Sequence, residues 1–233
     1  MKERPILFSG AMVRALLDGS KTQTRRVVKL PIEADAAWVG GWKIVHKALT
    51  QAVETFNRLL GKALGTDHVL CPYGQPGDRL WVRETWVCDD YRVQEGPYIE
   101  VPGAREALFY RADNEHPFES PEGKFWKPSI HMPRWASRIL LEVVSVRVER
   151  LNDCSQVDAI AEGAVSIRNQ AWDREHFPVW RYLFDEAVAA GTKPPIGPAP
   201  VQAYEALWES INGAGSWKAN PWVWVVEFRR VVL

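Results

Sequence analysis

The chain has 233 residues, of which 46% are hydrophobic and 25% are charged, and its 29 basic side chains balance 29 acidic ones. This apolar fraction excludes a disordered chain, and a chain of this length can bury a substantial core. A formal charge of zero argues against nucleic-acid binding through bulk electrostatics, because such affinity needs a basic excess or stripe.

The first predicted elements are two short strands with a helix between them. Residues 6–8 form an apolar strand, Ser9 is the expected N-cap, and an apolar helical stripe follows until Gly19. Residues 20–29 change from polar to β-branched and predict a second strand. Positions 31–70 contain another helical stripe and have the character of an insertion.

Turn-forming residues at 72–78 precede a strand predicted over 79–86. Residues 88–106 and 112–137 are rich in Pro, Gly and charge and predict loops around a short strand at 108–110. Between Ile139 and Val148 the apolar alternation changes phase after residue 143. Such a slip inside one long strand predicts a β-bulge.

The last third of the chain is expected to hold two helices and a long strand. Ser155 begins a capping-box-like helix start, and Gly163 stops that helix. Residues 164–200 form a variable region with a Pro-rich end, and an apolar stripe from Tyr204 to Ile211 predicts the next helix. In the final strand, 222–232, one face carries Trp222, Trp224, Val226 and Phe228.

These elements predict a mainly β fold with peripheral helices. The order shows no βαβ rhythm and no internal repeat, which favours an α+β architecture with a small mixed β-barrel and helices over its ends. We expect one domain over residues 1–233, enlarged by insertions near 31–70, 88–130 and 164–200.

Several kinds of chemistry are not indicated. The three cysteines, Cys71, Cys88 and Cys154, have no C-x-x-C spacing, and the five histidines are scattered, so we expect no metal and no cofactor. No Walker loop, G-x-G-x-x-G or G-x-S-x-G occurs. No apolar run approaches the ~18 residues of a membrane helix. The apolar stretch after residue 5 is too short for a secretory signal, so we expect a cytoplasmic protein with no membrane partner.

Three segments of the sequence contain candidate catalytic or binding residues. The segment from Gly19 to Arg26 gathers hydroxyls and cations, and a turn at 20–23 would bring Lys21 and Thr24 to one side; the alternative is a solvated basic strand edge. Glu162 stands at a helix C-terminus four residues after Asp158, against both local charge preferences. It marks either a site or an exposed acid on a frayed helix end.

The third segment has an arginine and a glutamate between two tryptophans. Arg83 and Glu84 lie between Trp81 and Trp86, an arrangement typical of a stacked cation or a carboxylate fork. A structural salt bridge is the alternative.

Four segments together resemble the ASCH domain family, whose members have a PUA-like β-barrel. They are Gly19–Arg26, Gly77–Trp86, Ala159–Gly163 and Leu207–Gly213, and they occur in the family's order. The general family motif G-x-K-x-x-E-x-R is met by Gly19, Lys21 and Arg26, with Thr24 in place of the glutamate. An amidohydrolase branch that hydrolyses N(4)-acetylcytidine has threonine there as well. This chain is about twice as long as the small enzymes of that branch.

The resemblance to this branch implies a metal-independent amidohydrolase that removes acyl groups from N4 of cytidine or cytosine. It makes Lys21, Thr24 and Glu162 catalytic: Thr24 as the nucleophile, Lys21 as its base, and Glu162 as the group that orients Lys21 or passes a proton. We expect Arg26 and Glu84 to read the pyrimidine edge and Trp81 to stack on the ring, with Arg83 beside them.

Two other functions stay open. An ASCH domain without turnover would bind an RNA segment or a modified base, and a ribonuclease would recruit Lys21, Thr24 and Arg26 around a phosphate. The expected partner is a small nucleoside or nucleobase substrate, with RNA only under these alternatives, and we expect no obligate protein partner.

Overall fold

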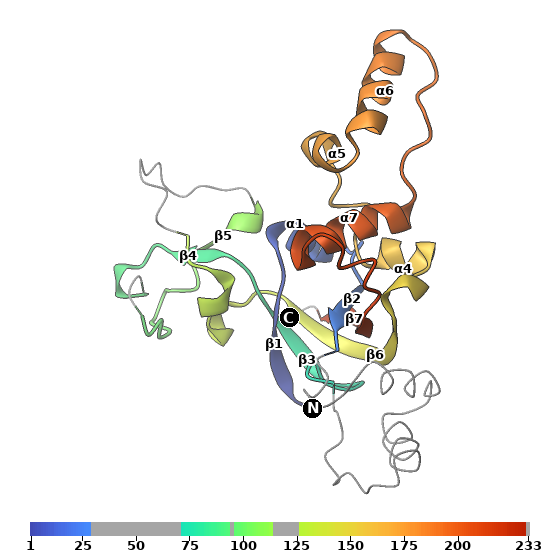
Figure 1. Cartoon of the computed structure of the whole chain (residues 1–233). Coiled ribbons are helices and arrows are strands. Elements are labelled where there is room, and N and C mark those ends of the chain that lie inside the picture. The colour runs from blue at the N-terminus through green and yellow to red at the C-terminus, as the bar shows by residue number, and fades with distance from the viewer. Residues whose placement is uncertain (29–70, 94–95, 114–125, 232–233) are drawn as a thin grey trace, which may run out of the picture.

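The computed structural model describes residues 1–28, 71–93, 96–113 and 126–231, and it places five strands in one mixed sheet (Figure 1). The strand order is β1-β3-β6-β7-β2. β1 runs parallel to β3, and the other neighbouring strands are antiparallel. The strands span Glu3–Leu7 (β1), Gln23–Val27 (β2), Arg79–Arg83 (β3), Leu140–Arg150 (β6) and Trp222–Val231 (β7).

The longest pairing in the sheet, between β6 and β7, contains the predicted bulge. The register shifts between Val143 and Ser145, and the extra residue, Val144, is 51% exposed. The break in apolar alternation therefore marked a real irregularity, and this prediction is confirmed.

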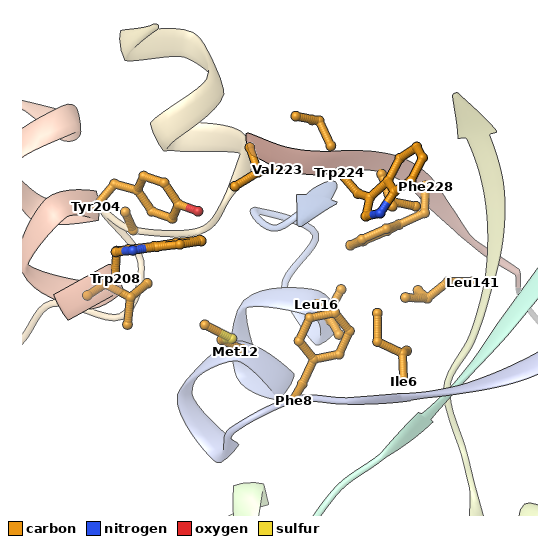
Figure 2. Close-up of a cluster of buried hydrophobic side chains, with 14 of the residues drawn as sticks. Ile6, Phe8, Met12, Leu16, Leu141, Tyr204, Trp208, Val223, Trp224 and Phe228 are labelled. Carbon is orange, nitrogen blue, oxygen red and sulfur yellow. The ribbon is translucent and has the colours of Figure 1, made fainter. Parts of the chain in front are cut away.

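Helices α1 (Gly10–Leu17), α4 (Gln156–Ala161) and α7 (Pro200–Asn212) pack against the sheet and one another. Figure 2 shows Phe8 and Leu16 meeting Leu141 and Phe228 in the resulting core. β7 is buried on both faces, because Val223 and Val225 are as inaccessible as the alternating aromatic residues that face the other way. Burial on both faces puts β7 at the centre of the fold.

The α+β class is confirmed, but the expected closed barrel is not found among the described residues. There β1 and β2 are the two edges of an open sheet, with no ladder between them. The carbonyl of Leu7, at the end of β1, accepts a hydrogen bond from Arg26 Nη2 at 2.7 Å, so a side chain takes the place of a backbone amide. Helix α1 connects the two edge strands, β1 and β2, along the chain.

The strand predicted over 79–86 is in fact divided between two sheets. β3 ends at Arg83, and β4 (Trp86–Cys88) pairs with β5 (Leu108–Tyr110) in a separate antiparallel sheet. This small sheet has its own core around the fully buried Trp86, with Met132 and Ala136. Part of the predicted 88–130 insertion is therefore a packed unit rather than loop alone, including 3-10 turns at Tyr91–Val93, Arg111–Asp113 and Ser129–His131. Two more such turns lie at Arg134–Ala136 and Leu151–Asp153.

The region 164–200 contains two helices that the sequence analysis did not predict. They are α5 (Gln170–His176) and α6 (Pro178–Ala189), and they extend away from the sheet as a pair (Figure 1). The expected insertion at 31–70 and its helical stripe lie outside the described residues. None of the helices that the structure describes has the length and apolar character to cross a membrane.

Candidate active site

The site begins where the chain enters β2 and passes the end of α4. The amide of Lys21 donates to the carbonyl of Ala15 and the amide of Thr22 to that of Ala161, both at 2.9 Å. An isolated antiparallel bridge also joins Lys21 to Glu162. These backbone contacts hold the two segments together although 141 residues separate them in the chain.

Local sequence signals explain why α4 ends at this place. Ser155 accepts a bond from the amide of Asp158, and the Asp158 carboxylate accepts one from the amide of Ser155, so the predicted capping box is present. Glu162 is the C-cap residue, and Gly163 follows with φ +79°. A glycine tolerates this left-handed conformation, and it turns the chain so that Glu162 faces β2.

Lys21 and Glu162 form a buried ion pair. Lys21 Nζ donates to Glu162 Oε2 at 3.0 Å, to the Glu162 carbonyl at 2.8 Å and to the Gln23 carbonyl at 2.7 Å. The two side chains are 0% and 2% exposed. All three ammonium protons therefore have acceptors, which satisfies a charge that would otherwise be costly to bury.

Arg25 holds the other carboxylate oxygen of Glu162. Its Nη1 donates to Glu162 Oε1 at 3.2 Å, while Nε and Nη2 donate to Glu149 Oε1. Asp158 lies 3.5 Å from Arg25 Nη2. Glu162 is thus fixed from two sides by two cations, and the buried guanidinium is surrounded by three carboxylates.

Burial changes the protonation behaviour of this cluster. Burial lowers the pKa of Lys21 below its ordinary 10.5, and the Glu162 charge opposes that effect without cancelling it. Burial also raises the pKa of Tyr204, which lies under Arg25, well above 10.0, so its hydroxyl stays neutral. A lysine with a lowered pKa next to a carboxylate is a common feature of acid–base sites.

A cavity of about 60 Å³ adjoins the cluster. Part of its wall comes from α1, β2 and the end of α4, through Met12, Thr24, Arg25, Arg26, Val27 and Glu162. Helix α7 supplies the rest, through Tyr204, Leu207, Trp208, Ile211 and Asn212. Figure 2 shows Tyr204 and Trp208 projecting from α7 toward the part of the core that holds Met12. Because Val27 and Ile211 are 41% and 53% exposed, the cavity reaches the surface on their side.

The structure brings together most of the catalytic set expected from the sequence. Thr24 is 3% exposed and shares the cavity wall with Glu162. Lys21 contacts Glu162 directly but is not itself one of the described residues that line the cavity. Glu162 is therefore the group that touches both the lysine and the cavity.

The expected substrate-binding residues separate into two places. Arg26 lines the cavity, with its guanidinium 5.4 Å from the Phe8 ring. Trp81, Arg83 and Glu84 are not among the described residues that line it. Arg83 stacks at 5.3 Å on Trp81 and donates to the Met132 carbonyl at 3.1 Å.

Glu84 takes part in a buried ion pair away from the cavity wall. It is 1% exposed and accepts two bonds from Arg138, at 2.9 and 3.1 Å. Arg138 also lies 3.9 Å from the centre of the Tyr110 ring in β5. Glu84 therefore forms a structural salt bridge, the alternative given for it above.

The cavity residues that sequence reasoning did not assign to the site include Arg25, Tyr204 and Trp208. The stripe through Tyr204 and Trp208 was recognised, but only as the apolar face of a helix. Arg25 gave no separate signal, because it stands next to Arg26 in a run of polar residues. Three-dimensional contacts alone distinguish the two arginines.

In the part of the chain that the structure describes, no three His, Cys, Asp or Glu side chains gather as metal ligands do. Comparisons with protein-family models, with curated proteins and with solved structures gave no match.

Proposed function

We propose that the chain is a metal-independent amidohydrolase that removes an acyl group from the exocyclic N4 of a cytidine or cytosine derivative. The observation that carries this proposal is the buried Lys21–Glu162 pair, which adjoins a cavity that Thr24 also lines. The motif resemblance to the ASCH family supplies the substrate class. We infer that the five-stranded sheet is the counterpart of the family's PUA-like barrel.

The proposed reaction has two halves. Thr24 Oγ1 attacks the acyl carbonyl and loses its proton to Lys21 Nζ; the C–N bond breaks, and that proton leaves with the cytosine N4 amine. Water then attacks the acyl-threonine ester, which releases the carboxylic acid and restores the hydroxyl. Each half uses the same base and needs no electron transfer.

For this role Lys21 must be neutral when the substrate is attacked. Its burial favours the neutral form, which supports the assignment. A neutral amine has two protons, so it can keep its bonds to the carbonyls of Gln23 and Glu162, and its lone pair then points at Glu162 Oε2. Because Glu162 lines the cavity and Lys21 does not, Glu162 relays the proton between the cavity and Lys21, while Arg25 fixes the carboxylate.

Arg26 is the proposed contact to the pyrimidine, because it is a partly exposed cation on the cavity wall and directly precedes the exposed rim residue Val27 in the chain. An arginine donates to O2 or N3 of cytosine and has no acceptor atoms of its own. We place the reaction in the cytoplasm, where three buried free thiols stay reduced.

A second candidate function is recognition of a modified base or of RNA without turnover. The bonding of Lys21 favours it, because an ammonium whose three protons are all accepted by protein oxygens is a stable structural group. The two functions differ in whether Lys21 gives up a proton, so measuring turnover separates them.

The test is hydrolysis of N(4)-acetylcytidine in the presence of EDTA, followed by the ultraviolet change on deacylation. We expect turnover by the wild-type chain and its loss in Lys21→Ala, Thr24→Ala and Glu162→Gln. Thr22→Ala is the matched control, because Thr22 lies on the same segment but is exposed and contacts its neighbours through backbone atoms.

The outcomes separate the three functions. Wild-type turnover that Thr24→Ala abolishes and Thr22→Ala preserves supports the amidohydrolase. Absence of turnover together with salt-dependent RNA binding at micromolar concentration supports the binding module. Cleavage of single-stranded RNA by the same preparation supports the ribonuclease.

A further inference from the structure

Thr24 and Tyr204 supply the two side-chain hydroxyl groups of the described cavity wall. Each side chain belongs to a residue that is 3% exposed. Neither hydroxyl makes a hydrogen bond to another described residue, and neither is one of the fully enclosed polar atoms that lack a partner, so both keep some accessible surface. A buried hydroxyl without a partner needs an explanation. The proposed reaction uses Thr24 as the nucleophile and gives the phenol of Tyr204 no role.

The ring of Tyr204 is held from several sides. The rings of Trp208 and Trp217 meet it edge-on, with centroids 6.2 and 5.8 Å away, and the guanidinium of Arg25 lies 5.9 Å from its centre. Figure 2 shows the hydroxyl end of Tyr204 pointing away from α7. Because burial raises the pKa of Tyr204, the hydroxyl keeps its proton and can donate it in a hydrogen bond. A donor fixed in this way is suited to stabilise a charge that develops during a reaction.

Other donors on the cavity wall are already in use or out of reach. Nitrogens of Arg25 donate to the carboxylates of Glu149 and Glu162. Asn212 Nδ2 donates to the Trp208 carbonyl at 3.0 Å. Trp208 Nε1 is fully enclosed, so a molecule in the cavity does not contact it. The hydroxyl of Tyr204 is therefore a neutral donor on this wall that remains uncommitted among the described residues.

We propose that the Tyr204 hydroxyl donates to the acyl carbonyl oxygen when Thr24 attacks and stabilises the oxyanion of the tetrahedral intermediate. The inference rests on the proposed amidohydrolase function and adds a catalytic residue to it. As the bond from Thr24 Oγ1 to the carbonyl carbon forms, the carbonyl π electrons move to oxygen, and they return when the C–N bond breaks. The same oxyanion forms again when water attacks the ester. Tyr204 keeps its proton throughout.

The volume of the cavity is consistent with a site for one substrate oxygen. The cavity measures about 60 Å³. At roughly the 30 Å³ that one water occupies in the liquid, this is room for about two water-sized groups. The carbonyl oxygen can enter it, while the rest of the substrate stays on the open side, where Val27 and Ile211 are exposed.

Tyr204→Phe tests this role, because it removes the hydroxyl and keeps the ring with its contacts. We expect kcat for N(4)-acetylcytidine to fall by about a hundred-fold and KM to stay within about three-fold of the wild type, since the donor acts mainly in the transition state. The urea midpoint of unfolding should not fall, because the lost hydroxyl has no hydrogen-bond partner among the described residues.

Tyr110→Phe is the matched control for the loss of a phenol hydroxyl. The Tyr110 hydroxyl donates to the Ala136 carbonyl at 2.8 Å, and Tyr110 is not one of the described residues that line the cavity. This variant should lower the urea midpoint, because it leaves that carbonyl without the bond, and should keep kcat within about two-fold of the wild type. The two variants therefore have opposite effects on activity and stability.

A substrate with sulfur in place of the acyl oxygen tests the contact itself. N(4)-thioacetylcytidine presents a thiocarbonyl, and sulfur is a weak hydrogen-bond acceptor. The ratio of kcat/KM for the oxygen substrate to that for the sulfur substrate, measured by release of cytidine, should fall by about ten-fold in Tyr204→Phe, because the variant has already lost the bond. The ratio should be unchanged in Tyr110→Phe.

The outcomes distinguish failure of this role from failure of the proposed function. Wild-type turnover that Tyr204→Phe retains to within about three-fold, or an unchanged oxygen-to-sulfur ratio in this variant, overturns the role of Tyr204 and leaves the amidohydrolase standing. A fall in the urea midpoint as large as that of Tyr110→Phe makes Tyr204 a structural residue and also overturns it. Absence of turnover by the wild-type chain overturns the amidohydrolase and this role with it.

Discussion

Lys21 and Glu162 are joined through their backbones in an isolated antiparallel bridge and through a 3.0 Å ion pair between their side chains. The backbone bridge places the carbonyl of Glu162 2.8 Å from Lys21 Nζ, so the lysine is bound by both parts of one residue. The geometry therefore depends on the path of the backbone after α4, and not on side-chain rotamers alone.

That path makes Gly163 a sensitive position. Its φ is +79°, and a Cβ atom there would lie 3.1 Å from Ala15 Cβ and 3.2 Å from Lys21 Cβ. We expect Gly163→Ala to lower the free energy of unfolding by about 2–4 kcal/mol, from backbone strain and overpacking together. The measurement is urea-induced unfolding followed by fluorescence.

Gly191 provides the control for the strain alone. Its φ is +66°, but no atom of the described residues lies within 4 Å of the position that a Cβ would occupy. Gly191→Ala should therefore cost only about 1–2 kcal/mol. Equal losses in the two variants would show that the contact with Ala15 and Lys21 contributes nothing.

A double-mutant cycle on Lys21 and Glu162 should reveal strong coupling. Glu162→Leu leaves Lys21 without its carboxylate and Arg25 with one fewer, so we expect it to cost about 3–5 kcal/mol of unfolding free energy. Lys21→Met should cost less, because Arg25 still compensates Glu162. The double variant should fall short of the sum by about 1–3 kcal/mol. Additivity to within about 0.5 kcal/mol would contradict a coupled pair.

The sequence predicts local features of this fold well where the signal lies within a few residues. The phase change after residue 143 predicted the bulge, and Ser155 and Gly163 predicted both ends of α4. Similar signals for the missed helices are present: Asn169 caps α5, and Pro178 occupies the first turn of α6. These caps are local signals from which the two helices could have been predicted.

Features that depend on distant contacts could not be predicted in this way. Alternation across residues 79–86 indicates which side chains are buried, but not that the strand divides between two sheets after Arg83. Barrel closure depends on whether two edges pair, and alternation within one strand carries no such information. The same holds for the site, where Arg25 is distinguished from Arg26 only by the carboxylates around it.

Arg138→Met should destabilise the fold in a pH-dependent manner. Burial raises the pKa of Glu84, and Arg138 opposes this effect through two hydrogen bonds. Without Arg138 the folded chain binds a proton at Glu84 at a pH where the unfolded chain does not. The free energy of unfolding should then fall as pH rises through this window, with a loss of about 3–5 kcal/mol at neutral pH and less in acid.

Arg134→Met is the matched control for a lost arginine. Arg134 pairs with Glu3 at 2.8 Å, but their side chains are 41% and 36% exposed. We expect a change of about 0–1 kcal/mol, because solvent screens such a pair. A loss for Arg138→Met no larger than this, or one independent of pH, would show that Glu84 is not held as a buried charge.

The pH dependence of hydrolysis tests the role of Lys21 as the base. Because burial lowers the pKa of Lys21, the neutral amine forms below the ordinary 10.5, and kcat/KM should rise with pH through a midpoint below that value. Between the two pKa values the folded chain binds fewer protons than the unfolded chain, so the free energy of unfolding should rise over the same range. Both quantities can be measured from about pH 6 to about pH 11.

Lys21→Arg should be inactive, because a guanidinium keeps its proton throughout this range, while Thr22→Ala should follow the wild-type profile. A level profile, or activity in Lys21→Arg, would exclude Lys21 as the group that accepts the Thr24 proton.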